Sequence, residues 1–190
     1  MISVEPIRDR EQIKEIEKRL AALNTDIGRK QYLLFMIGVY LARRISDMIV
    51  LRVDDLRGKE MLILREKKTK KRIELAIPQK LQRVLKQRLK GLDGNAYIFE
   101  SRQRDEKGHK THISRMTGYN YVKDIGRIGE LEFPFACHSL RKTFGYHFYK
   151  KTHDIGMLMD LFNHSKERIT LMYIGIATDE KRQALSNFEF

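Results

Sequence analysis

An apolar run over residues 32–42 constrains the fold of this chain more than any other segment. The basic pairs Arg29-Lys30 and Arg43-Arg44 flank it. The run is far shorter than the ~20 residues that a transmembrane helix needs. It therefore predicts a helix over about 26–42 that is buried at the centre of a globular core, with the other elements packed around it.

Several further segments carry apolar residues at helical spacing and are bounded by residues typical of helix ends. We expect helices at about 9–23, 47–52 with Ser46 as N-cap, 79–90, 114–128, 139–151, 154–163, 166–174 and 179–187 with Thr178 as N-cap. Most of the chain is therefore predicted to be helical.

The segments 60–65 and 72–77 are instead rich in branched and aliphatic residues, as strands are. They enclose a lysine-rich tip, Glu66-Lys67-Lys68-Thr69-Lys70-Lys71, so they predict a hairpin. We expect 53–56 to add a third strand, and the polar segment 101–112 to be an exposed loop. The expected fold is one α+β domain over residues 1–190, mostly α-helical, with a small antiparallel three-stranded sheet.

The chain of 190 residues has 38 lysines and arginines against 25 acidic residues, a net charge of +13. Such an excess favours a polyanionic partner, first nucleic acid and second an acidic membrane surface. A solvated basic surface is the simpler alternative. A single cysteine excludes an internal disulfide and favours a reducing, cytoplasmic setting.

A set of polar residues after the core helix, in the hairpin and in the last third of the chain suits phosphodiester chemistry. It comprises two arginines, a lysine, two histidines and a tyrosine. Arginines can neutralise the non-bridging oxygens, a tyrosine hydroxyl can attack phosphorus once a base takes its proton, and a lysine can protonate the leaving oxygen. No metal or cofactor is needed for such a reaction, because side chains supply the cations.

The same residues resemble the catalytic domain of the tyrosine recombinases, the phage-integrase family that includes Xer-type enzymes. The matching blocks are Arg44-Ile-Ser-Asp47, Lys68-Thr69 in a hairpin turn, His138-x-x-Arg141, and His164 followed nine residues later by Tyr173. Each block alone is weak, but all of them occur in the family's order and spacing, from about residue 12 onward.

The resemblance implies a role for each catalytic residue. Arg44 and Arg141 would bind the scissile phosphate, and His164 would hydrogen-bond it. His138 would accept the proton of the nucleophile Tyr173. Lys68 would protonate the leaving 5′ oxygen, and Asp47 would support the site without reacting.

The chain departs from the family pattern at two glycine positions. Asn163 replaces the glycine before the second histidine, and Ala42 replaces the glycine two residues before the first arginine. The second change leaves Arg43 as a competitor of Arg44. Neighbouring lysines in the hairpin, above all Lys67, likewise compete with Lys68.

Simpler explanations exist for each residue taken alone. His164 could cap a helix, and Tyr173 could be a core aromatic residue. Cys137 beside His138 could suggest a thiol nucleophile, although a buried inert thiol is the expectation. His109, His112 and His138 lack the spacing of a zinc site.

The expected function is that of a site-specific DNA recombinase that cuts and rejoins double-stranded DNA through a covalent 3′-phosphotyrosine. The alternatives are a catalytically silent DNA-binding regulator on the same scaffold and, less favoured, a metal-dependent nuclease. The resemblance implies a homotetramer on paired DNA sites, with exchange of a C-terminal helix as one use of the apolar residues in 185–190. The core-binding domain that most family members carry before the catalytic domain is expected to be absent. An excised catalytic fragment and a small single-domain recombinase both fit this expectation.

Overall fold

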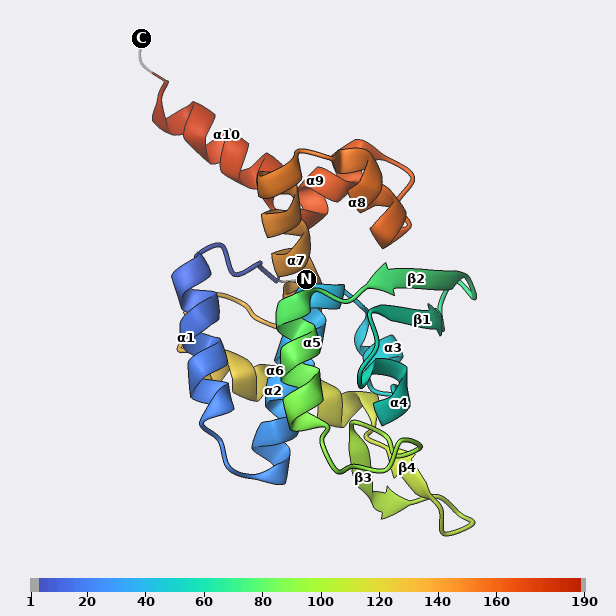
Figure 1. The fold of residues 1–190 in the computed structure, drawn as a ribbon. Helices are drawn as coiled ribbons and strands as arrows, with labels where there is room; N and C mark the ends of the chain where they lie inside the picture. Colours follow the sequence, from blue (N-terminus) through green and yellow to red (C-terminus); the bar gives the residue numbers. More distant parts are fainter. Residues whose placement is uncertain (1–3, 189–190) are drawn as a thin grey trace.

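The computed structural model describes residues 4–188 and places α2 (Asp26–Leu41) at the centre of the main body (Figure 1). Every residue of α2 from 30 to 39 is buried. Helices α1 (Arg10–Ala21), α5 (Gln79–Arg88), α6 (Arg115–Ile128) and α7 (Cys137–Thr152) pack against it. The prediction of a buried central helix is therefore confirmed.

Three helices gather beyond the end of α7, at the top of Figure 1: α8 (Ile155–Phe162), α9 (Glu167–Ile174) and α10 (Ile176–Ser186). They share a second, smaller apolar cluster with the C-terminal half of α7. Helix α10 points away from the main body, and most of its residues are exposed.

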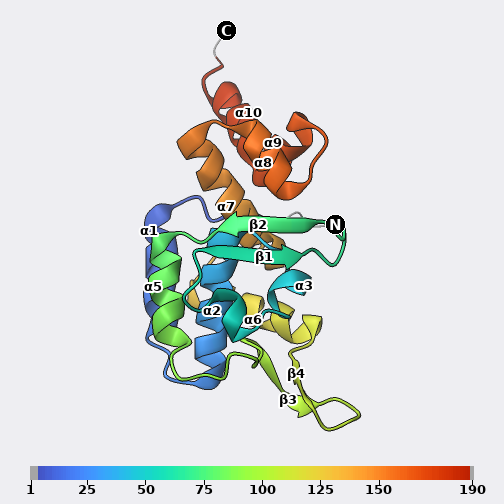
Figure 2. The ribbon, with the colours of Figure 1, turned by 45° about the vertical axis from the view of Figure 1, so that its right-hand side comes forward.

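Strands β1 (Met61–Arg65) and β2 (Arg72–Ala76) form the predicted antiparallel hairpin, with Met61 opposite Ala76 and Arg65 opposite Arg72. Its tip spans residues 66–71. The short helices α3 (Ile45–Met48) and α4 (Val53–Leu56) connect α2 to β1. Helix α3 lies close to the hairpin (Figure 2).

The prediction of a three-stranded sheet is wrong, because residues 53–56 form helix α4 and the described residues contain two separate two-stranded sheets. Val53 and Leu56 are three residues apart and both fully buried, which suits one helical turn. Asp55 accepts a hydrogen bond from the backbone N–H of Arg52 at the helix start. Acidic residues in a first helical turn are stabilising.

The segment expected to be a loop also contains regular structure. Strands β3 (Glu100–Arg104) and β4 (Lys110–His112) pair antiparallel and project at the opposite end of the molecule from α10 (Figures 1 and 2). Asp105 accepts backbone hydrogen bonds from Lys107 and His109, and Gly108 has a positive φ of 80°. Aspartate and glycine are residues that favour such turns, so the hairpin signal was present in the sequence.

Two predicted helix starts also differ from the structure. Helix α3 begins at Ile45 rather than Asp47, and α10 begins at Ile176, directly after Gly175, so neither Ser46 nor Thr178 is an N-cap. The remaining helices lie within a few residues of their predicted bounds. The molecule is mostly helical α+β, as expected, and no helix within residues 4–188 has the length and apolar character for a membrane span.

Candidate active site

Two left-handed residues end the helices that lead into the site. Ala42 ends α2 with a φ of 52°, and the chain then turns so that Arg44 starts α3. Asn163 ends α8 with the same φ, directly before His164. Glycine adopts this conformation without cost, and asparagine is among the residues that tolerate it best. The two departures from the family's glycine pattern therefore occur where a positive φ is required, and both preserve it.

The end of α2, the β1–β2 tip and the first turn of α7 surround an open pocket of about 620 Å³. Four of the six predicted site residues line it: Arg44, Lys68, His138 and Arg141. Further cations in its lining are Arg43, Lys67 and Arg115. No aspartate or glutamate belongs to this lining among the described residues. The pocket is therefore suited to bind an anionic group.

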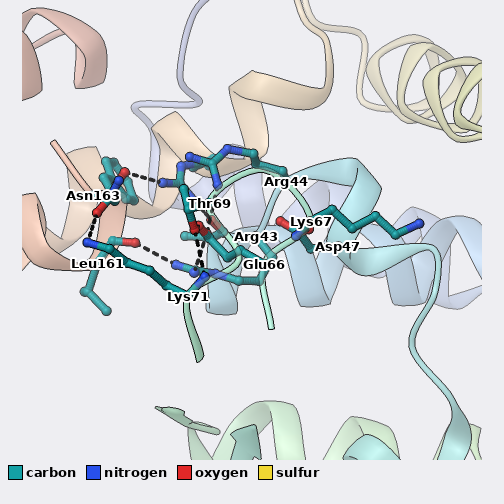
Figure 3. Close-up of polar contacts among 12 residues, drawn as sticks. Arg43, Arg44, Asp47, Glu66, Lys67, Thr69, Lys71, Leu161 and Asn163 are labelled. Atoms are coloured by element: carbon teal, nitrogen blue, oxygen red, sulfur yellow. Dashed lines mark hydrogen bonds and ion pairs between the residues drawn. The ribbon is translucent and has the colours of Figure 1, made fainter. Parts of the chain in front are cut away.

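The structure distinguishes between the two competing arginines. Arg43 is fully buried and is engaged inside the protein, where Nε donates to Leu41 O (2.8 Å) and Nη2 to Leu161 O (2.9 Å) (Figure 3). The side chain of Arg44 is one-fifth exposed at the pocket, and its Nη1 lies 2.9 Å from Glu66 Oε1. These contacts favour Arg44 as the residue that meets a ligand.

Arg141 is buried at the inner end of the pocket. Its Nη1 donates to Ala42 O (2.6 Å) and its Nη2 to Phe162 O (3.1 Å), so it connects the ends of α2 and α8. Burial, with a smaller contribution from nearby Arg43, lowers the pKa of Arg141 to about 10. It still carries its charge at neutral pH, and a guanidinium has further N–H groups to offer a phosphate.

The predicted base and nucleophile lie in contact. His138 in the first turn of α7 and Tyr173 in α9 place Nδ1 and Oη 3.0 Å apart. Burial, followed by the charges of Arg141 and Lys142, lowers the pKa of His138 below 6.5, so its ring is neutral at pH 7 and can accept a proton. Burial raises the pKa of Tyr173, although the nearby arginines oppose this shift. The tyrosine is therefore protonated until a base removes its proton.

His164 lies beside Tyr173 rather than in the lining of the 620 Å³ pocket, with the two ring centroids 5.3 Å apart. Its Nδ1 is 3.0 Å from Thr170 Oγ1, a contact that orients the ring. It also lines a second groove, which runs between β2 and α8. Burial and the charge of Arg141 lower the pKa of His164, so it too is neutral at pH 7.

The hairpin tip presents both Lys67 and Lys68 to the pocket. The backbone N–H of Lys67 donates to Asp47 Oδ1 (3.0 Å), so the buried Asp47 supports the tip, in line with its predicted role. Lys68 is close enough to His138 that its charge helps to lower the pKa of that histidine. The geometry is compatible with Lys68 as the proton donor, and equally with Lys67, which lines the same pocket.

Glu66 is a buried residue of this region that the sequence reasoning did not select. Its carboxylate lies within ion-pair distance of Arg43 (3.2 Å) and Arg44 (2.9 Å) and accepts a hydrogen bond from Thr69 Oγ1 (2.7 Å) (Figure 3). Burial opposes ionisation, but Thr69 and the arginines lower the pKa of Glu66 on balance. The one signal in the sequence was an acidic residue inside an otherwise basic turn.

The structure bears on two of the alternatives for single residues, the Cys137 thiol nucleophile and the zinc site. Cys137 is buried, and burial raises its pKa to about 12, so it is the inert thiol that was expected. Within residues 4–188, no three of the His, Cys, Asp and Glu side chains lie together as a metal site would require.

Comparison with known proteins gives consistent matches. Residues 9–180 match the Phage integrase family. The chain is 37% identical over 185 residues to the "Probable integrase/recombinase YoeC" of Bacillus subtilis (strain 168), covering 97% of each protein.

Solved structures with only 15–16% identity share the fold. The crystal structure of XerA recombinase superposes with a TM-score of 0.70 over 98% of this chain and 67% of that one. The structure of the XerH site-specific recombinase bound to difH substrate superposes with a TM-score of 0.68, over 100% of this chain and 56% of that one. The chain thus spans little more than half of XerH, and the shared part has the expected mostly helical fold.

Proposed function

The chain belongs to the phage integrase family, and from this premise we propose that it cuts and rejoins duplex DNA through a covalent 3′-phosphotyrosine at Tyr173. It is a tyrosine-type site-specific recombinase. One observation carries the assignment of the nucleophile: Tyr173 Oη lies 3.0 Å from the neutral imidazole of His138, beside a cationic pocket.

In the proposed cleavage step, Tyr173 Oη attacks the scissile phosphorus and its proton passes to His138 Nδ1. The bond from phosphorus to the 5′ oxygen breaks, and Lys68 supplies the proton that this oxygen needs. Arg44 and Arg141 bind the non-bridging oxygens as negative charge builds there, and His164 donates a further hydrogen bond. Rejoining is the reverse, with a 5′ hydroxyl as nucleophile and Tyr173 as leaving group.

Double-stranded DNA is the proposed partner, and a homotetramer on two sites the proposed assembly. The net charge of +13 and the carboxylate-free pocket support the first proposal. The XerH structure contains DNA, and a lambda integrase structure is a dimer on a core site. The exposed outer half of α10 carries Leu185, and Phe188 just beyond the helix end is also exposed, which supports exchange of this helix between copies; Phe190 lies outside the described residues.

We further propose that the chain is one catalytic domain. Helix α1 packs on α2 and α6, and the segment before it donates from Ile7 N–H to Thr143 Oγ1 in α7 (2.9 Å). Helix α1 therefore belongs to the same hydrophobic core as the helices that position the catalytic residues.

The test uses nicked duplexes tiled across the DNA that flanks the gene. Each nick lies just 3′ of a candidate scissile phosphate, so that the short 5′-hydroxyl fragment diffuses away and traps the adduct. We expect a protein–DNA adduct that survives denaturing electrophoresis, maps to Tyr173, and forms equally with and without EDTA.

The Tyr173→Phe variant should bind DNA and form no adduct, while Tyr149→Phe, at a half-buried tyrosine of α7, serves as the matched control. An adduct that persists in Tyr173→Phe would overturn the nucleophile. Binding by the unaltered protein with no adduct on any duplex would instead favour the silent regulator.

A further inference from the structure

Three cations from three different segments bind the last turn of α8, residues 161–163, directly before His164. The contacts are Arg43 Nη2 to Leu161 O (2.9 Å), Arg141 Nη2 to Phe162 O (3.1 Å) and Lys71 Nζ to Asn163 Oδ1 (2.6 Å). Positive groups are favourable at a helix C-terminus, where carbonyl oxygens lack partners. Arg141 already has a role at the phosphate, whereas Arg43 and Lys71 have none.

Arg43 and Lys71 are connected to each other through the hairpin tip. Arg43 Nη1 lies 3.2 Å from Glu66 Oε1, and Glu66 and Lys71 face one another where the tip closes, with the backbone N–H of Glu66 donating to Lys71 O (2.9 Å). We call Arg43, Glu66 and Lys71 the linking cluster. Figure 3 shows these three residues where the tip meets Leu161 and Asn163 at the end of α8.

The buried pair at the centre of the linking cluster is poorly explained by stability alone. The side chains of Arg43 and Glu66 are 0% and 1% exposed. Removing two charges from water costs about as much as their attraction returns, so apolar residues of similar size are often equally stable there. Apolar neighbours are at hand, because Arg43 also borders a small cavity lined by Leu75, Phe144 and Phe148. Compared with apolar residues of similar size, the ion pair adds orientation, because it holds the Arg43 and Glu66 side chains in one position relative to each other.

We propose that the linking cluster holds the hairpin tip and the end of α8 in register, so that Lys68 and His164 meet the same phosphate as Arg44. Glu66 contributes twice, because its carboxylate also lies 2.9 Å from Arg44 Nη1. Arg43, Glu66 and Lys71 are thus positioning residues. The proposal rests on the proposed function, since it concerns the alignment of that same site.

The first test does not depend on DNA cleavage. Hydrogen–deuterium exchange is measured on the full chain and on Lys71→Ala, with Lys70→Asn as the matched control. Both changes remove one charge from the tip; Lys70 is exposed, has a φ of 60°, and asparagine tolerates this conformation.

Lys71→Ala should raise exchange of the amides in 161–166 by roughly fivefold or more, as expected for loss of a hydrogen bond to a charged group. Lys70→Asn should leave these amides unchanged. Equal exchange in both variants would overturn the link between the tip and α8.

The second test separates positioning from binding. The adduct rate under single-turnover conditions, the Kd for the same duplex and the melting temperature are measured for Arg43→Leu, Glu66→Gln and the double variant. Each single change should slow the adduct step roughly ten- to hundredfold with little change in Kd, because each removes a charged hydrogen bond away from the DNA.

The double variant should be less impaired than the product of the two single effects, because it removes the buried Arg43 that Glu66→Gln alone leaves without its carboxylate partner. Adduct rates equal to the unaltered protein, or losses matched by Kd alone, would overturn the positioning role. Failure of the unaltered protein to form an adduct would count against the proposed function instead. The hydrogen–deuterium exchange result would still decide whether the hairpin tip is linked to the end of α8.

Discussion

At the scale of single residues, Ala42 and Asn163 show how a site can keep its geometry while its sequence pattern changes. Both residues end a helix with a φ of 52°, and each is followed within two positions by a predicted site residue. An alanine in this conformation costs about 1 kcal/mol that glycine would avoid. The backbone turn, rather than the glycine itself, is what places Arg44 and His164.

The pH dependence of cleavage should report the environment of His138. Its pKa is lowered from 6.5 by burial and by the charges of Arg141, Lys142, Arg44 and Lys68. A base must be neutral, so the decline of the adduct rate toward acidic pH should have its midpoint below pH 6.5, with a slope of about tenfold per pH unit below that midpoint. Single-turnover rates between pH 5 and 8.5 measure this midpoint.

His164 is the control for that profile, because its pKa is lowered by similar causes. His164→Asn should slow cleavage and keep the midpoint of the pH profile. His138→Gln should react slowly, and its adduct rate should no longer decline at acidic pH. A midpoint above 6.5 in the unaltered protein would contradict the lowered pKa of His138.

The resemblance to the tyrosine recombinases implies the six candidate site residues, but it does not indicate which other residues orient them. Glu66 and Arg43 matter through contacts between segments 23 positions apart and, for Arg43 and Leu161, 118 positions apart. Nothing local in the sequence marks such a pair. The block Arg44-Ile-Ser-Asp47 favours Arg44 over Arg43, and the burial of Arg43 gives this preference a physical reason.

At the scale of elements, periodicity worked where an element is long and failed where it is short. The central helix α2 and the β1–β2 hairpin were predicted because several consecutive residues repeat one pattern. Helix α4 has only four residues, which is too short for a helical repeat to show in the sequence. The β3–β4 hairpin was missed because its strands are polar and none of their residues is fully buried.

The tip between β1 and β2 offers a prediction that separates Lys67 from Lys68. A substrate with sulfur in place of the leaving 5′ oxygen needs no acid, since a thiol ionises near pH 8.5. Lys68→Ala should lose roughly a hundred- to a thousandfold in adduct rate on the normal nicked duplex, and nearly recover on the sulfur-containing one. Lys67→Ala should show the same modest loss on both substrates.

The comparison is internally controlled, because both variants remove one positive charge from the same tip. Recovery of Lys67→Ala and not of Lys68→Ala would transfer the acid role to Lys67. Recovery of neither would remove the hairpin from acid catalysis.

At the scale of the whole molecule, Tyr173 and the exposed α10 are close neighbours in the chain. Only Gly175, with a φ of 88°, separates α9 from α10. A displacement of α10 is therefore transmitted directly to α9, the helix that carries the nucleophile. On its own chain, α10 is held by Ile176, which is buried, and by Asp179, whose carboxylate lies 3.0 Å from Arg8 Nε. Its outer half carries Leu185, which is exposed.

Changing that outer half should impair assembly and spare the fold. Leu185→Asp should leave the melting temperature and the affinity for a single DNA site unchanged, because Leu185 is 65% exposed. It should weaken the pairing of two DNA-bound dimers by about 2 kcal/mol or more, the range seen when a central apolar contact of an interface is lost. Sedimentation velocity of the protein with a labelled duplex measures both the complex on a single DNA site and the paired, tetrameric complex. Gln183→Ala on the same helix is the control. Tetramers of unchanged stability in Leu185→Asp would show that α10 does not join the copies, and that the outward course of this helix serves some other contact.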